Sequence, residues 1–232
     1  MTKLSFLRIA PTIREKIWGW RYLLFQIIFL PHLLPCIRWL FSVPLSTAML
    51  NFLCFCINFC AAIVIFHKFL RLYLKADGKQ LLRIAWVSVL FFAVYWLANT
   101  ALGKIFAAID PTFANVNDQS VSNLSRENYI LMFIGTVFLV PVAEECFHRG
   151  LVFRGLYDRS PAAAYICSIA IFSAVHIMNY VGVYDFGTLA LCFLQYVPAC
   201  ICLAAAYRLS GSIFAPILIH TAVNAIGMLA LR

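Results

Sequence analysis

Long runs without a charged residue alternate with short basic segments along the chain. These runs extend over residues 22–37, 39–67, 84–103, 128–143, 160–184, 186–207 and 209–231. Because one membrane-spanning helix needs about 20 mostly apolar residues, the pattern predicts an all-α, polytopic transmembrane helical bundle of about seven spans, within a range of six to eight. Pro31 and Pro35 break the short first run, which predicts a kinked span or a segment that dips into one leaflet.

The composition excludes most other classes of protein. Hydrophobic residues make up 64% of the 232 residues and charged residues 12%, against roughly 45–50% and 25% in a typical soluble domain. The chain has too few polar side chains to cover a globule in water, which excludes a soluble domain, a disordered segment, a collagen and a coiled coil. Nine Cys occur without a CxxC spacing, so we expect small hydrophobes rather than metal ligands.

The distribution of positive charge predicts how the chain is oriented. A net charge of +9 would suggest nucleic-acid binding in a soluble protein. In this chain we expect basic loops at an anionic cytoplasmic surface, with membrane lipids and no nucleic acid as partners. A cytoplasmic N-terminus places 14 basic residues inside and 4 outside, as the positive-inside rule requires. Inside lie Lys3, Arg8, Arg14, Lys16, Arg21, Lys68, Arg71, Lys75, Lys79, Arg83, Arg149, Arg154, Arg159 and Arg208; outside lie Arg38, Lys104, Arg126 and Arg232.

Polar residues that a bilayer tolerates poorly gather in three of the late runs. Glu144 and Glu145 end the fourth run, His176 lies in the fifth, and His220 and Asn224 lie in the last. A charge near the bilayer centre costs about 2.5–3.5 kcal/mol, so it marks a functional site by default. Each cluster alone can be interpreted as a salt bridge or an interhelical hydrogen bond. Their coincidence predicts one functional site.

The spacing of these clusters predicts that they lie at similar depth. The fourth and fifth spans are expected to turn at residues 158–161, and Glu144 and His176 each lie 16 residues from Ser160. In an antiparallel hairpin both would stand roughly 24 Å from the turn. This requires the fourth helix to continue to about Leu156.

The predicted site has the groups that peptide hydrolysis needs. A Glu in an apolar environment can act as a general base, and a His beside it can orient the attacking water. His220 and Asn224 share a helix face and can donate hydrogen bonds to an oxyanion. Alternatively, two His and one Glu can bind zinc and leave the second Glu as the base. Periodicity alone leaves both mechanisms open.

The three clusters resemble the motifs of the CPBP family, which comprises CAAX proteases and bacteriocin-processing enzymes and is also called the abortive-infection family. Its pattern of EExxxR, FxxxH and HxxxN is matched by residues 144–149, 172–176 and 220–224. The match covers about residues 129–230, whereas residues 1–128 carry no recognisable signature. We therefore expect the chain to form a single integral membrane domain, with its catalytic core in the last four spans.

The resemblance implies an intramembrane endopeptidase that cleaves a peptide or a lipid-modified protein. It implies that Glu144 and His176 activate the water. His220 and Asn224 would then form the oxyanion site. The prenyl-protein protease branch of the family is understood as a glutamate type without a catalytic metal. By analogy no cofactor is favoured here, and zinc is the alternative.

The resemblance also implies supporting roles for other residues of the first motif. Glu145 and Arg149 would brace the site as an i, i+4 pair. The family commonly has an aromatic residue at position 148, where this chain has His148. Because His148 stands four residues after Glu144, we expect it to modulate that carboxylate or to offer a further ligand.

Two rival functions use the same residues. A catalytically silent scaffold or bacteriocin-immunity protein would tolerate the loss of a motif residue, but none is missing. A transporter would show paired repeats or broken helices in both halves of the chain, whereas the polar groups crowd into one half. We therefore expect a protease of a bacterial plasma membrane. Its substrate and oligomeric state do not follow from the sequence.

Overall fold

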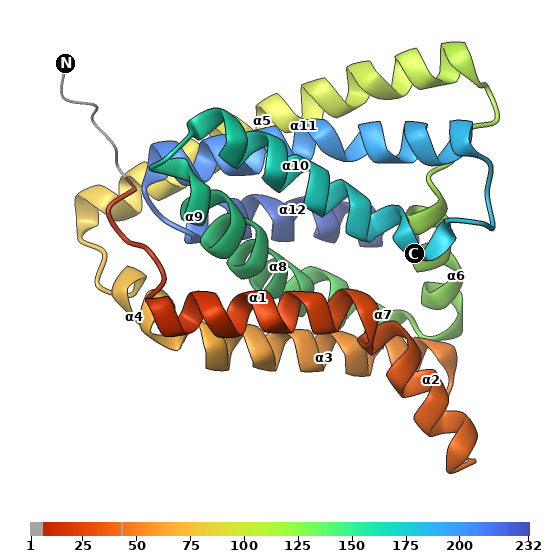
Figure 1. Ribbon diagram of the computed structural model, residues 1–232. Helices are drawn as coiled ribbons and strands as arrows, with labels where there is room; N and C mark the ends of the chain where they lie inside the picture. Colours follow the sequence, from red (N-terminus) through yellow and green to blue (C-terminus); the bar gives the residue numbers. More distant parts are fainter. Residues whose placement is uncertain (1–6, 43) are drawn as a thin grey trace.

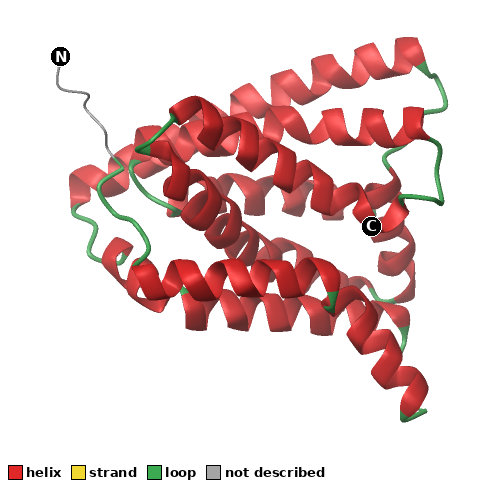
Figure 2. Cartoon of the chain, in the orientation of Figure 1, coloured by secondary structure: helices red, strands yellow, loops and turns green. Residues whose placement is uncertain are grey.

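The computed structural model describes residues 7–42 and 44–232, most of which are helical. Within these residues there is no strand, although Val181 and Tyr184 form an isolated bridge (Figure 2). The predicted all-α class is therefore confirmed. In chain order the elements are α1 (Ile13–Ile28), α2 (Leu30–Leu40), α3 (Thr47–Ile65), α4 (His67–Tyr73), α5 (Gly78–Ile109), α6 (Val116–Glu127), α7 (Tyr129–Ile134), the π-helical η1 (Gly135–Leu139), α8 (Val140–Glu145), the π-helical η2 (Cys146–Phe153), α9 (Arg154–Tyr157), α10 (Pro161–Ile177), the 3₁₀-helical η3 (Met178–Tyr180), α11 (Phe186–Ser210) and α12 (Phe214–Ala230).

Among the described residues, five helical stretches are long and apolar enough to cross a membrane. A sixth candidate is formed by α1 and α2 together, which meet at a bend of 56°. The apolar helix α12 is shorter, at 17 residues. With α12 included, these segments correspond to the seven predicted spans, and the chain is an integral membrane protein. The five long candidates are Thr47–Ile65, Gly78–Ile109, Tyr129–Tyr157, Pro161–Tyr180 and Phe186–Ser210.

The bend in the first span follows from Pro31. The N–H of Phe29 still bonds to the carbonyl of Phe25 and completes α1. Pro31 stands in the first turn of α2, and it has no N–H with which to continue the hydrogen bonding of α1. The bend agrees with both predicted forms of this run, a kinked span and a segment that dips into one leaflet.

The stretch Tyr129–Tyr157, which comprises α7 to α9, forms the central helix. In its most apolar window 44% of the residues are buried, against 11% for α5. The central helix contacts α1 and α3 on one side and α10 and α12 on the other (Figure 1). On α5, Trp86, Val89 and Leu97 are exposed, as expected of side chains that face lipid. The central helix therefore carries its motif into the middle of the bundle.

The turn between the fourth and fifth spans falls where the sequence predicts it. α9 ends at Tyr157, and Ser160 caps α10 by accepting a hydrogen bond from the N–H of Ala163. Pro161 opens α10, at a position where a missing N–H leaves no helical bond unmade. The fourth helix thus continues past its polar motif to the turn.

Candidate active site

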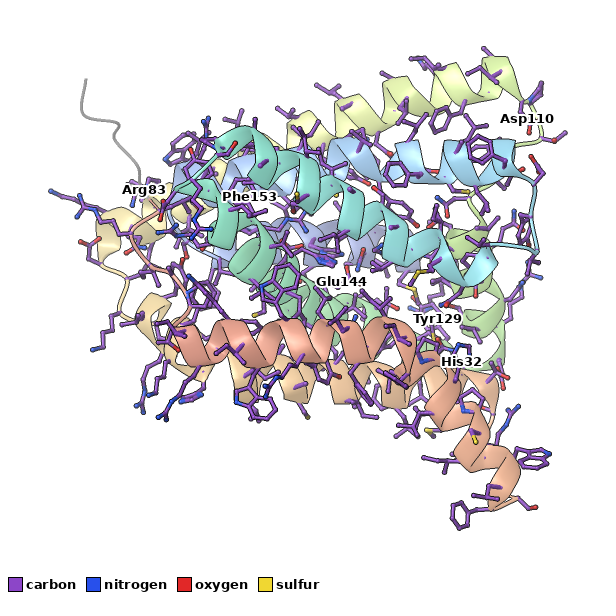
Figure 3. All side chains as sticks on the ribbon, in the orientation of Figure 1. His32, Arg83, Asp110, Tyr129, Glu144 and Phe153 are labelled. Carbon is purple, nitrogen blue, oxygen red and sulfur yellow. The ribbon has the colours of Figure 1, made fainter. Side chains whose placement is uncertain are left out.

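Three helices bring Glu144, His176 and His220 together. Figure 3 shows Glu144 near the middle of the bundle. The Nε2 atom of His176 lies 3.9 Å from Oε1 of Glu144, and Nε2 of His220 lies 3.9 Å from its Oε2. These distances are too long for direct hydrogen bonds. The Glu144 side chain is 21% exposed. Its carboxylate is therefore held between two imidazole rings and remains accessible to a small molecule.

Hydrogen bonds at the far side of each ring fix which nitrogen faces Glu144. Nδ1 of His176 lies 2.8 Å from the carbonyl oxygen of Phe172, and Nδ1 of His220 lies 2.9 Å from Oε1 of Glu145. A carbonyl and a carboxylate can only accept, so both Nδ1 atoms carry a proton. Each ring thus presents Nε2 to Glu144, as in the paired histidines of many hydrolytic sites.

Glu145 lies behind the site and joins two helices. Its Oε1 accepts hydrogen bonds from Nη1 of Arg149 at 3.1 Å and from Nδ1 of His220 at 2.9 Å. The side chains of Glu145 and Arg149 are both fully buried. The Arg149 guanidinium also stacks over the ring of Phe172, 4.9 Å from its centre. The expected i, i+4 pair is present, and it connects the central helix to α10 and α12.

Asn224 occupies a position that the sequence does not foresee. Its Nδ2 donates to the carbonyl oxygen of Thr136 at 2.9 Å. In the π-helical segment η1, the N–H of Val140 bonds to Gly135, five residues back. The next residue, Pro141, has no N–H, so the Thr136 carbonyl lacks a donor in this register. Asn224 supplies that donor, since buried carbonyls need a partner, and its second amide hydrogen remains free for other use.

This pairing predicts a compensating double substitution. Asn224→Ala removes the donor from a part-buried carbonyl and is expected to lower the unfolding free energy by about 1–3 kcal/mol. Adding Pro141→Ala restores a backbone N–H and should recover part of that loss. Thermal unfolding of the purified protein in detergent measures both effects. Asn51→Ala, which removes a bond within one exposed helix, is the control. Equal losses in the single and double variants would contradict the pairing.

His148 does not meet Glu144. It is buried, and no described residue bonds either of its ring nitrogens. Its ring packs edge-on against Phe172 with 4.9 Å between ring centres. No hydrogen bond joins His148 to the Glu144 carboxylate, since the His148 side chain is buried in the core and does not line the cavity. His148 packs there as an aromatic ring would.

Two further contributors carry no signal in the sequence. Tyr196, on α11, stacks on His176 with 4.3 Å between ring centres, and its hydroxyl donates to Asn115 at 3.4 Å. Thr136 enters only through its backbone carbonyl. Tyr196 lies within an apolar run, where an aromatic residue is normally interpreted as part of the core. The acceptor at Thr136 is a backbone carbonyl, which every residue type has, so the sequence gives no sign of it.

The proposed site residues border a cavity of about 1030 Å³. Glu144, His176, His220 and Asn224 all line it, and so does Asp118 of α6. Burial among the surrounding helices raises the pKa of the Asp118 carboxyl, and its electrostatic interaction with His176 lowers that pKa in part. The cavity is large enough to hold a segment of polypeptide beside the Glu144 carboxylate.

The site residues do not form a ready metal centre. Across residues 7–42 and 44–232, no three His, Cys, Asp or Glu side chains are arranged to hold a metal ion. The two Nε2 atoms lie 3.9 Å from different oxygens of Glu144. The described residues thus hold no preformed group of three metal ligands.

A comparison with protein families agrees with the residues of the site. A family model described as type II CAAX prenyl endopeptidase, Rce1-like, matches residues 126–226, a segment that contains all three motifs. Comparisons with curated proteins and with solved structures gave no match. Residues 126–226 are therefore similar to the Rce1-like type II CAAX prenyl endopeptidases, in agreement with the resemblance of the three motifs to the CPBP family.

Proposed function

We propose that this protein is an intramembrane endopeptidase that hydrolyses a peptide bond in a peptide or a lipid-modified protein. The observation that carries the proposal is the convergence of two imidazole Nε2 atoms on the Glu144 carboxylate, at 3.9 Å each, beside a cavity of about 1030 Å³. A bound water between these groups would be a nucleophile for a peptide carbonyl. The Rce1-like match supports this class of reaction.

The first step uses Glu144 and His176. A water oxygen that bonds to both groups fits the 3.9 Å between them, which is too long for a direct bond. Nε2 of His176 is free to accept one hydrogen of the water, because its proton is on Nδ1. Glu144 takes the other proton as the general base. The water oxygen then attacks the carbonyl carbon and forms a tetrahedral intermediate.

The second step uses His220 and Asn224. Glu145 accepts from Nδ1 of His220, and a proton taken up from solvent at Nε2 would make the ring an imidazolium that donates toward the cavity. The free amide hydrogen of Asn224 is the other donor to the oxyanion. Protonated Glu144 then gives its proton to the leaving nitrogen, the C–N bond breaks, and a carboxylic acid and an amine are released.

We propose that this reaction uses water without zinc, and the metal content tests that choice. Purified, active protein is expected to contain far less than one zinc per chain, and chelators are expected to leave the cleavage rate unchanged. The support is the donor geometry, in which the described residues offer no site with three ligands. Stoichiometric zinc together with loss of activity on chelation would favour the zinc-dependent version of the protease.

The function itself is tested by a comparison of peptide termini in host membranes. One culture carries the unaltered protein and the other carries Glu144→Gln at equal expression. Termini that appear only with the unaltered protein would establish proteolysis and identify the substrate. Identical termini would instead indicate a catalytically silent membrane scaffold.

A further inference from the structure

The cavity beside Glu144 has a charge opposite to that of the chain. Glu144 and Asp118 line it, whereas no Lys or Arg of the described residues does. With its histidines neutral, the lining carries two negative charges, in a chain whose net charge is +9. Glu144 takes part in the proposed reaction, but Asp118 has no role in it. The second carboxylate of the cavity therefore needs an explanation of its own.

Asp118 presents an unpaired carboxylate to the cavity. It lies in the first turn of α6, which contacts α10 near the end of that helix (Figure 1). Its backbone N–H donates to the side chain of Asn115, which caps α6. Its carboxylate forms no hydrogen bond or ion pair with any described residue. The side chain is exposed and lines the cavity, so a ligand in the cavity can reach it.

The surroundings of this carboxylate favour a bound positive charge. Although the side chain is open to the cavity, burial among the helices raises the pKa of the Asp118 carboxyl, and the interaction with His176 lowers that pKa only in part. The ionised form thus lacks a full compensating charge within the protein. A cation that lies within about 4–6 Å of a carboxylate stabilises the ionised form. A ligand that carries a positive group would supply that charge.

The neighbouring side chains suit an organic cation. Tyr95 of α5 and Tyr196 of α11 line the same cavity, and both interact electrostatically with Asp118. A carboxylate beside aromatic rings can hold a Lys or Arg side chain through an ion pair together with cation–π contacts. A bare metal ion fits less well, because no three His, Cys, Asp or Glu of the described residues are arranged to bind one.

Amide side chains on the cavity wall suit a polypeptide. Gln26 of α1 lines the cavity, and its Oε1 has no hydrogen-bond partner among the described residues. Asn58 of α3 also lines it and uses Oδ1 to accept from Tyr22, so its amide hydrogens remain available. A carboxamide can both donate and accept, as a peptide backbone does. These groups can therefore bind the main chain while Asp118 binds a side chain.

We propose that Asp118 binds a Lys or Arg side chain of the substrate and thereby selects polypeptides with a basic residue near the scissile bond. The reference to a scissile bond rests on the proposed function, whereas the binding of the basic side chain does not. Asp118 is in these terms a specificity-determining residue. It holds the basic side chain in the cavity in which Glu144 meets the peptide bond.

A binding measurement tests this site without requiring cleavage. The protein is purified in detergent as the Glu144→Gln variant, which keeps the probes intact. The probes are two fluorescent apolar peptides that differ only in one central residue, Lys or Gln. Fluorescence anisotropy is expected to show about tenfold or more tighter binding of the Lys peptide, the usual effect of a hydrogen bond to a charged group. Adding Asp118→Asn, which keeps the shape of the side chain, should abolish this preference.

Two further variants separate a local effect of Asp118 from a general loss of negative charge. Asp185 caps α11 and does not line the cavity. Asp185→Asn keeps a capping side chain and is expected to leave the preference for Lys unchanged. Asp118→Lys reverses the charge and is expected to favour a third peptide, with Glu at the central position, over the Lys peptide.

Equal binding of the Lys and Gln peptides, binding of neither, or a preference that survives Asp118→Asn would overturn the proposal. In the last case a lower unfolding temperature of Asp118→Asn would assign the carboxylate to the N-terminus of α6, where a negative charge stabilises the helix. Cleavage is then measured with Glu144 restored. A preference for the Lys peptide that depends on Asp118, without cleavage of either peptide, would contradict the proposed function and leave the basic-residue site established.

Discussion

Glu144→Gln is expected to lower the cleavage rate by about 10²–10⁴-fold, the usual contribution of a general base, without unfolding the protein. Gln keeps the size and shape of Glu but cannot take the proton of the attacking water. Oε2 of Glu144 has no hydrogen-bond partner among the described residues, and the nearest imidazole nitrogens lie 3.9 Å from the carboxylate, so the change breaks no hydrogen bond at Oε2. Initial rates on an identified substrate and thermal unfolding in detergent measure the two effects separately.

The matched control is the same chemical change at another carboxylate. Glu127 accepts hydrogen bonds from the N–H groups of Thr47 and Ala48 at the start of α3. Glu127→Gln keeps one of the two acceptor oxygens, so it is expected to leave the cleavage rate unchanged and to lower the unfolding temperature only by the loss of one hydrogen bond. If Glu144→Gln cleaved as fast as this control, the carboxylate would not be the base.

Several features of the fold could be predicted from the sequence because they depend on local rules. Charge-free runs give the apolar helices, since each span must be long enough to cross the hydrocarbon core. The residues before Pro161 mark the turn, and equal spacing from it predicts that Glu144 and His176 face each other. The structure brings those two residues together. Helical geometry alone was sufficient for this step.

Other features could not be predicted, because they depend on a backbone register that three-dimensional packing selects. The π-helical segment η1 leaves the Thr136 carbonyl without a donor, and this draws in Asn224. The second π-helical segment, η2, widens the helix where His148 turns into the core. Single π-helical turns are rare in proteins as a whole, and those that do occur are often found at functional sites. A regular α-helix drawn through the same residues puts His148 on the face of Glu144, whereas in the structure His148 is buried and does not line the cavity that Glu144 borders.

The two adjacent glutamates differ in their surroundings although they are neighbours in the sequence. Successive residues of a helix point about 100° apart, so Glu144 faces the cavity while Glu145 faces the packed helices. Glu144 is partly exposed and has a free oxygen. Glu145 is fully buried and pairs with Arg149. The cleavage reaction is thus expected to depend on Glu144, and the stability of the fold on Glu145.

Glu145→Gln is accordingly expected to lower the unfolding free energy by about 3–5 kcal/mol, the usual cost of breaking a buried ion pair. The reason is that Arg149 would keep its charge in a site with no exposure to solvent. Thermal unfolding in detergent measures the loss. In the double variant Glu145→Gln with Arg149→Met, no uncompensated charge remains, and most of the stability is expected to return.

The comparison of the two Gln variants is the sharper test, because both make the same chemical change at neighbouring positions. Glu144→Gln should be stable and nearly inactive. Glu145→Gln should be unstable, yet its folded fraction should retain part of the activity, since a Gln oxygen can still accept from Nδ1 of His220 and hold that ring in place. Equal stability of the two variants would show that the Glu145–Arg149 pair does not brace the site. Equal loss of activity per folded molecule would instead assign Glu145 a direct part in the reaction.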